Sequence, residues 1–157
     1  MLLLSALLTV SSSNAAATQA ARLRVVGELV QESSLAAGQA SSGSVMLHND
    51  GTTPVQVVVY PRDAAADESS AAVVGSNRAW LRFTPRLVTV DPGGSAELPY
   101  RVEVPADAEV AGAYGTVLVI EPTAAPVWPP PADPAAETAV EGYRVNIVTH
   151  VSPWGSP

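Results

Sequence analysis

The chain has 157 residues, no cysteine and a formal net charge of -7 at pH 7. A chain of this length is typical of one domain, and without cysteine it cannot contain a disulfide. The acidic balance argues against binding to nucleic acid, which requires a basic face. Aromatic residues make up only 5% of the chain, so valine, leucine and alanine must fill the core.

The N-terminus carries the pattern of a secretory signal peptide. Residues 2–10 are a short apolar run, and small residues follow it up to Ala21. The run is too short to cross a membrane as a helix, which needs about 20 apolar residues. No Lys or Arg precedes Arg22, so the usual basic start of such a peptide is missing. We predict that residues 1–20 are a cleaved signal peptide, that the protein is periplasmic or secreted, and that no integral membrane segment remains after cleavage. The alternative is a buried N-terminal helix.

After residue 21 the pattern is one of short strands separated by turns. Asn49-Asp50-Gly51 and Asp91-Pro92-Gly93-Gly94 are typical turn sequences, because these residues tolerate the backbone angles of tight turns. Residues 31–42 are polar and small, and they are a predicted connection. Residues 61–76 are rich in Ala, Asp and Ser and are a predicted loop, with a short edge strand inside it as the alternative. The expected strands are residues 22–30, 43–49, 54–60, 78–84, 86–90, 95–104, 113–120 and 142–151.

The clearest expected strand covers residues 95–104. Leu98 and Val102 share one face, while Glu97 and Arg101 share the other. Such alternation predicts one buried and one solvated face. Pro99 lies on the solvated face and has no N–H group, so we expect one side of this strand to lie at an edge or a bulge.

Many short strands without helical periodicity predict an all-β fold, a single immunoglobulin-like antiparallel β-sandwich of about seven strands. A closed barrel is the alternative. The sandwich should cover residues 21–152, with a Pro-rich loop at 122–141 and a tail at 153–157. Trp80 is expected in the core. Tyr114 has the position of either a tyrosine corner or an ordinary half-buried strand residue.

Four motifs lie in the second half of this pattern: WLRFTP at 80–85, VDPGGS at 90–95, YRVEVP at 100–105 and GAYG at 112–115. They resemble the Ig-like domains of bacterial exported proteins, and the nearest named group is the N-terminal domain of periplasmic pilus chaperones. A second group with such motifs is the Ig-like domains of cell-wall and surface-associated proteins. The likeness covers roughly residues 22–151.

In pilus chaperones the last strand of this domain presents alternate apolar residues to an incomplete pilin by β-strand addition. The resemblance implies that residues 143–151 act in this way, with Val145, Ile147 and Val151 as donor residues. The alternative is an internal strand that is fully paired in its own sheet. The family's second domain is not matched here. Its conserved Arg and Lys pair is not matched either, because the chain has no Lys, and Arg144 stands in the strand that carries that Lys.

No residue set points to catalysis, a cofactor or a metal. The chain has no cysteine nucleophile and no Gly-x-Ser-x-Gly turn. Its two histidines, His48 and His150, alternate with apolar neighbours, as surface histidines on the solvated face of a strand do. Zinc would need three or four ligands. Either a calcium site or an ordinary solvated loop would explain the polar and acidic loop residues Asn49, Asp50, Asp63, Asp67 and Glu68. We expect a protein that is not an enzyme and has no cofactor.

Two functions fit these expectations. The preferred one is an exported protein-binding module, chaperone-like toward pilus or surface subunits, that acts through its last strand and Pro-rich loop. The alternative is a structural or adhesive surface module that binds glycan or cell wall through Trp128 and Trp154. Each of these two tryptophans could instead cap one end of the sandwich. The candidate partner-binding residues are Val145, Ile147, Val151, Trp128 and Arg144.

Overall fold

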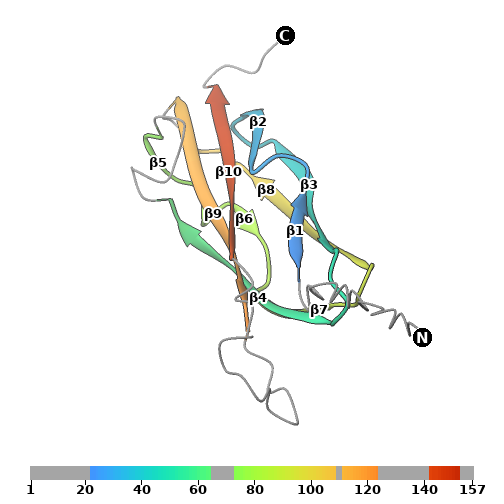
Figure 1. The fold of residues 1–157 in the computed structure, drawn as a ribbon. Coiled ribbons are helices and arrows are strands. Elements are labelled where there is room, and N and C mark those ends of the chain that lie inside the picture. The colour runs from blue at the N-terminus through green and yellow to red at the C-terminus, as the bar shows by residue number, and fades with distance from the viewer. Residues whose placement is uncertain (1–21, 65–72, 109–110, 124–141, 153–157) are drawn as a thin grey trace, which may run out of the picture.

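The computed structural model describes residues 22–64, 73–108, 111–123 and 142–152 (Figure 1). These residues form two β-sheets and no helix, so none of them could cross a membrane as a helix. The predicted signal peptide and tail, and most of the Pro-rich loop, lie outside the described residues. The strands are β1 (Leu23–Val26), β2 (Val30–Ala36), β3 (Ala40–Asn49), β4 (Val55–Asp63), β5 (Gly75–Ser76), β6 (Leu81–Arg82), β7 (Arg86–Val90), β8 (Ser95–Glu103), β9 (Gly112–Pro122) and β10 (Tyr143–Ser152).

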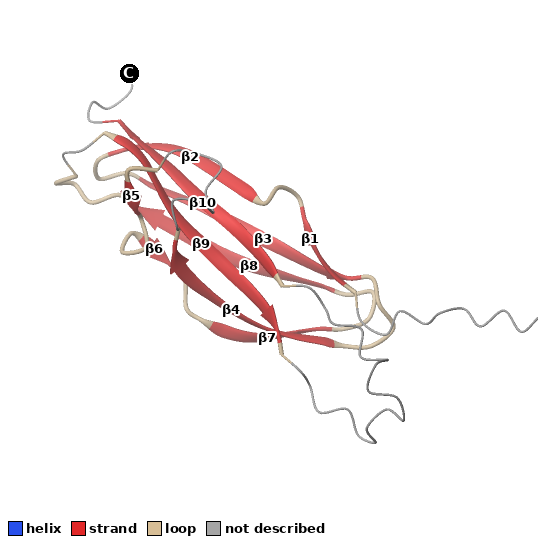
Figure 2. Ribbon diagram, turned by 60° about the vertical axis from the view of Figure 1, so that its left-hand side comes forward, coloured by secondary structure: helices blue, strands red, loops and turns tan. Residues whose placement is uncertain are grey.

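The strands pack as a two-layer sandwich (Figure 2). The first sheet has the order β1-β3-β8-β6, and all its pairs are antiparallel. The second sheet has the order β2-β10-β9-β4-β7, and β5 pairs with β9 outside this path. The all-β sandwich is confirmed. The expectation that it is wholly antiparallel is corrected at two pairs, because β2 runs parallel to β10 and β5 runs parallel to β9.

The core lies between the two sheets and is almost wholly aliphatic. Alternate residues of each long strand point into it, and each buried aliphatic side chain contributes about 1.5–3 kcal/mol to folding. Trp80 is half-buried and packs at the margin of this core, with its ring centroid 4.6 Å from that of Tyr114. The most deeply buried large side chains are Leu47, Leu98, Leu118, Ile120 and Ile147.

A buried polar cluster fixes the segment between β5 and β6 to the second sheet. The side chain of Asn77 is fully buried and donates to the Ile147 carbonyl at 3.3 Å and to the Thr149 hydroxyl at 3.0 Å. The Thr116 hydroxyl donates to the Asn77 side-chain oxygen. Buried polar groups are costly unless they are paired, so these bonds hold Asn77 in one position against β9 and β10.

The chain changes sheets at both lateral sides of the sandwich. On one side, β1 of the first sheet continues as β2 of the second sheet, and we call this the β1–β2 side. On the other side, β6 of the first sheet continues as β7 of the second sheet, and we call this the β6–β7 side. Gly27 lies between β1 and β2 with a φ of 100°, an angle that glycine adopts at little cost.

The first of these crossovers corrects the expected strand order. Residues 22–30 were expected as one strand and residues 31–42 as a connection, but the second segment holds β2 and the start of β3. The physical reason is that β2 is an edge strand with one buried residue, Leu35. Its Gln and Ser residues join the sheet through backbone pairing with β10. Because these side chains are polar, the hydrophobic alternation that indicates a strand is absent.

Candidate functional site

The last strand is internal. β10 pairs with β9 along Tyr143–Val151 and with β2 along Asn146–Ser152 (Figure 1). Val145, Ile147 and Val151 are 0%, 1% and 5% exposed and belong to the core. In the isolated chain these three side chains are therefore not displayed to a partner, and their role in partner binding stays a prediction.

The other two predicted partner residues have different positions. Arg144 is exposed, on the face of β10 that points away from the core. Trp128 lies outside the described residues, as does Trp154, so the structure adds nothing to the glycan-binding alternative.

Edge strands are the places where a sandwich can pair with another chain, because their outer N–H and C=O groups have no neighbour in the sheet. Among the described residues, the strands paired on one side only are β1, β2, β5, β6 and β7, and β2 is the longest of them at seven residues. It contains no proline. Sequence analysis missed β2 as a strand, and so also missed it as a candidate site.

The direction of the backbone groups of β2 follows from one hydrogen bond. The Asn146 N–H donates to the Leu29 carbonyl at 2.8 Å, so Leu29 faces β10. Successive residues of a strand direct their backbone groups to opposite sides. The residues facing away from β10 are therefore Val30, Glu32 and Ser34, and no described strand pairs with them on that side.

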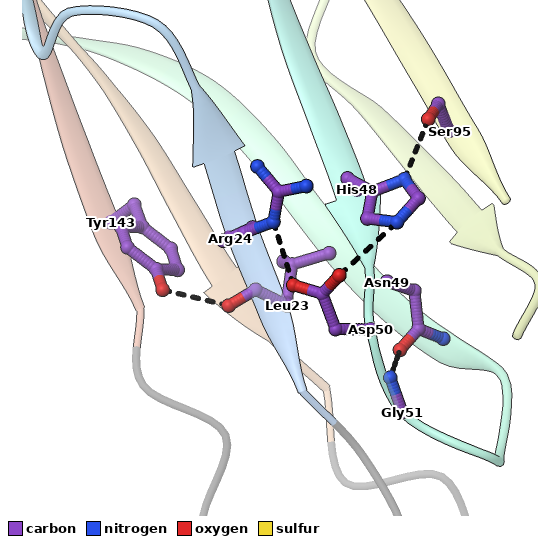
Figure 3. Close-up of polar contacts among 8 residues, drawn as sticks. All are labelled: Leu23, Arg24, His48, Asn49, Asp50, Gly51, Ser95 and Tyr143. Atoms are coloured by element: carbon purple, nitrogen blue, oxygen red, sulfur yellow. Dashed lines mark hydrogen bonds and ion pairs between the residues drawn. The ribbon is translucent and has the colours of Figure 1, made fainter. Parts of the chain in front are cut away.

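Hydrogen bonds flank this outward row. At its far end Ala36, the next residue that faces outward, is already bonded to Gln39. The Gln39 N–H donates to the Ala36 carbonyl at 3.0 Å, and the Gln39 side-chain oxygen accepts from the Ala36 N–H at 2.9 Å. At the near end of the same lateral side the Tyr143 hydroxyl donates to the Leu23 carbonyl at 2.7 Å (Figure 3). This bond ties the start of β10 to the edge of β1.

The β6–β7 side is protected by proline. The Glu103 N–H donates to the Trp80 carbonyl at 2.9 Å, so Glu103 directs its backbone groups toward β6. Every second residue of β8 faces the same side, and Pro99 is one of them. Pro99 lies beyond the last pair of β6, Arg82 with Arg101. By the same argument Pro61 of β4 faces the side of β7, beyond the last pair, Val59 with Arg86. Proline has no N–H to offer, which is how natural sheets block pairing at an edge. The expectation that Pro99 marks an edge is confirmed.

Polar residues on the outer face of the first sheet form a second feature (Figure 3). The Asp50 carboxylate binds Arg24 Nε at 2.6 Å and His48 Nε2 at 3.2 Å. The Ser95 hydroxyl lies 2.8 Å from His48 Nδ1. Ser95, His48 and Asp50 are thus in contact in the order found in a hydrolytic triad.

These contacts lack what a hydrolytic triad needs around it. An oxyanion requires nearby N–H donors, but in the adjacent turn the Gly93 N–H donates to the Asn49 carbonyl and the Gly94 N–H to the Asp91 carbonyl. Neither of the two main hollows among the described residues is lined by the three side chains. The contacts of His48 and Asp50 connect β1, β3 and β8.

The oxygen atoms considered for calcium are already in use where they are described. The Asn49 side chain is buried, accepts from the Gly51 N–H and donates to the Thr53 and Val90 carbonyls. Asp63 accepts from the Ser76 hydroxyl. The described residues contain no group of three or more His, Cys, Asp or Glu placed to hold a metal. Asp67 and Glu68 lie outside the described residues.

Comparisons with known proteins agree with this fold. No family model matches the chain, and no curated protein matches it. The PapD-like domain 7 of human CEP192 is 15% identical, with 99% of each chain covered and a TM-score of 0.51. A chain of the CsuC–CsuE chaperone–tip adhesion subunit complex from Acinetobacter baumannii is 13% identical, with a TM-score of 0.51, and 85% of the present chain matches 58% of it. A family 123 glycoside hydrolase from Clostridium perfringens is 9% identical, with a TM-score of 0.56, and 84% of the chain matches 24% of it.

The class of the protein follows from the fold and these comparisons together. The chain has the PapD-like, immunoglobulin-like fold, an all-β sandwich of two sheets. The same fold occurs in a human protein, a pilus chaperone complex and part of an enzyme, so it does not by itself specify an activity.

Proposed function

We propose that this protein is an exported, non-enzymatic protein-binding module that receives an extended segment of a partner at the free edge of β2. The observation that supports this most is the outward row Val30, Glu32 and Ser34 on the longest edge strand, free of proline. Main-chain hydrogen bonds along such an edge provide affinity for an added strand.

The partner class is proposed from the fold. A chain of this fold occurs in a chaperone–tip adhesion subunit complex, and the motifs of the sequence resemble pilus chaperones. We therefore propose a pilus or surface subunit as the partner. The proposed contact differs from the one expected from the sequence, because β2 already lies beside the strand that carries Val145 and Ile147.

The experiment compares two substitutions at one residue. Ser34→Pro removes the last N–H of the outward row without removing a bond to β10, whereas Ser34→Val keeps that N–H. Partners are captured by each variant and by the wild type from a periplasmic extract, identified by mass spectrometry and then titrated in purified form. We expect Ser34→Pro to weaken binding at least about tenfold, since several edge bonds are lost together, and Ser34→Val to bind within about twofold of the wild type.

Amide hydrogen exchange makes the test specific to the edge. A partner strand on β2 should slow exchange at Val30, Glu32 and Ser34. A partner that binds both Ser34 variants equally, and leaves these amides unprotected, would rule out strand addition at β2.

A further inference from the structure

The β6–β7 crossover, residues 83–85, borders a hollow on the surface. This hollow has a volume of about 450 Å³, and Arg82 lines both this hollow and a second one of about 480 Å³. Arg86 lines the first hollow and Arg101 the second. We call the two hollows together the arginine groove.

Arg86 is the least satisfied charge of this groove. Its guanidinium carbon lies 5.2 Å from the centroid of the Phe83 ring. It forms no ion pair with a carboxylate among the residues that the structure describes. The contact with the ring fixes the position of the guanidinium group, while its N–H donors, which lie in its plane, remain available for a carboxylate.

The other two arginines share one carboxylate. Arg82 Nε lies 3.1 Å from Glu103 Oε2 and Arg101 Nε lies 2.8 Å from Glu103 Oε1. Hydrogen bonds from Arg101 and then Arg82 hold the pKa of Glu103 below its usual range. The groove therefore carries three guanidinium groups against this one carboxylate, an excess of positive charge on a chain whose formal net charge is -7.

The backbone here is unsuited to receiving a strand, because Pro99 lines the first hollow and offers no N–H to the outer side. A ligand of this groove would be bound by side chains. Arg82 lines both hollows, Arg86 lines the first and Arg101 the second, so their positive groups suit a ligand with several separated carboxylates better than a single terminal carboxylate.

We propose that the arginine groove binds an extended, acidic segment of a partner protein, with side-chain carboxylates of that segment on Arg86 and Arg82. The charge of the groove, the aromatic support under Arg86 and the lack of a carboxylate partner for its guanidinium group among the described residues all favour this ligand. The proposal goes beyond strand addition at β2 and does not depend on it, since Arg82 and Arg86 belong to β6 and β7 on the opposite lateral side, while Gln39 near the end of β2 borders only the second hollow.

The test uses the full chain and a fluorescein-labelled hexaglutamate peptide with an amidated C-terminus. Variants Arg86→Gln and Arg82→Gln each remove one charge of the groove. Arg22→Gln removes the same charge from an exposed residue at the start of the described chain. We expect hexaglutamate binding to weaken about tenfold or more with Arg86→Gln, because charge-assisted hydrogen bonds are lost, several-fold with Arg82→Gln, and less than about twofold with Arg22→Gln. Circular dichroism shows whether each variant is folded.

Two further probes identify the ligand class. The first is a neutral hexapeptide with a free C-terminal carboxylate, and the second is a thymidine hexanucleotide. We expect both to bind at least about tenfold more weakly than hexaglutamate. Equal binding of the neutral peptide would replace the proposal with a terminal-carboxylate site, and equal binding of the oligonucleotide would replace it with a phosphate site.

Other outcomes would also overturn the proposal. These are an absence of hexaglutamate binding, and equal losses with Arg86→Gln and Arg22→Gln, which would indicate attraction by overall charge. The two proposals fail separately, because Ser34→Pro should leave hexaglutamate binding unchanged and Arg86→Gln should leave exchange protection at β2 unchanged.

Discussion

The two lateral sides of this sandwich are built in the same way and yet offer different surfaces. On each side the chain leaves the first sheet and joins the edge of the second. The β1–β2 side crosses at a glycine and continues into an edge strand without proline. The β6–β7 side crosses beside three arginines, and strand prolines lie at its open edges.

Our two proposals assign a different kind of recognition to each side. Backbone groups are available on the β1–β2 side, where Val30, Glu32 and Ser34 face outward. On the β6–β7 side proline removes backbone donors, and guanidinium groups line the surface instead. Main-chain pairing reads the shape of an extended segment, whereas arginine selects for carboxylate. The four predictions below test how each side is held in place.

The largest effect should come from Ile147→Asp, which places a charge in the core against which β2 and β10 pack. Ile147 is 1% exposed, and an unpaired buried carboxylate should lower the free energy of unfolding by about 4 kcal/mol or more. Urea denaturation measures this change. Arg144→Asp places the same group on an exposed position of β10 and should cost less than about 1 kcal/mol. A stable, folded Ile147→Asp protein would show that β10 is not a core strand.

Asn77→Ala should have the next largest effect, on the segment that leads from β5 into β6. It leaves the Thr116 and Thr149 hydroxyls and the Ile147 carbonyl without their buried partner, at a cost of about 2–3 kcal/mol. The control is Arg78→Ala at the exposed neighbouring residue, for which we expect almost no change in thermal stability. If both variants melt alike, the Asn77 cluster does not anchor this segment.

Gly27→Ala tests the crossover of the β1–β2 side. No other residue crowds the position, but its φ of 100° is strained for any residue with a Cβ. We expect a loss of about 1–2 kcal/mol, measured by urea denaturation, against a negligible loss for Glu28→Ala in the same connection. Equal stability of Gly27→Ala and the wild type would mean that this backbone can relax without cost.

The smallest effect concerns pH and the β6–β7 side. The lowered pKa of Glu103 means that its ionised form favours the folded state, so its contribution is present above the pKa of an unfolded glutamate and is lost as the pH falls through the folded value. Wild type should therefore be slightly more stable than Glu103→Gln at neutral pH, and the two melting temperatures should converge in acid. A difference that grows as the pH falls would have the wrong sign.

Several features of the fold could be predicted from local sequence alone. The alternation around Leu98 and Val102 indicated one buried face, and both residues are 1% exposed. The position of Pro99 indicated an edge, because a proline lacks an N–H wherever it is placed. The turn sequence that contains Gly93 was also readable, and this glycine has a φ of 68°.

Strand periodicity and turn chemistry are properties of neighbouring residues, so an all-β sandwich could be predicted from the sequence alone. Which strands lie at the edges depends on the tertiary fold. Val145 and Ile147 have the pattern of any apolar strand, and β2 as a neighbour is what makes their strand internal. The candidate surfaces likewise depend on contacts between distant residues, such as Arg82 with Glu103 and Asn146 with Leu29. Local pattern records which face of a strand is buried, whereas the pairing of its two backbone edges is set by segments far away in the chain.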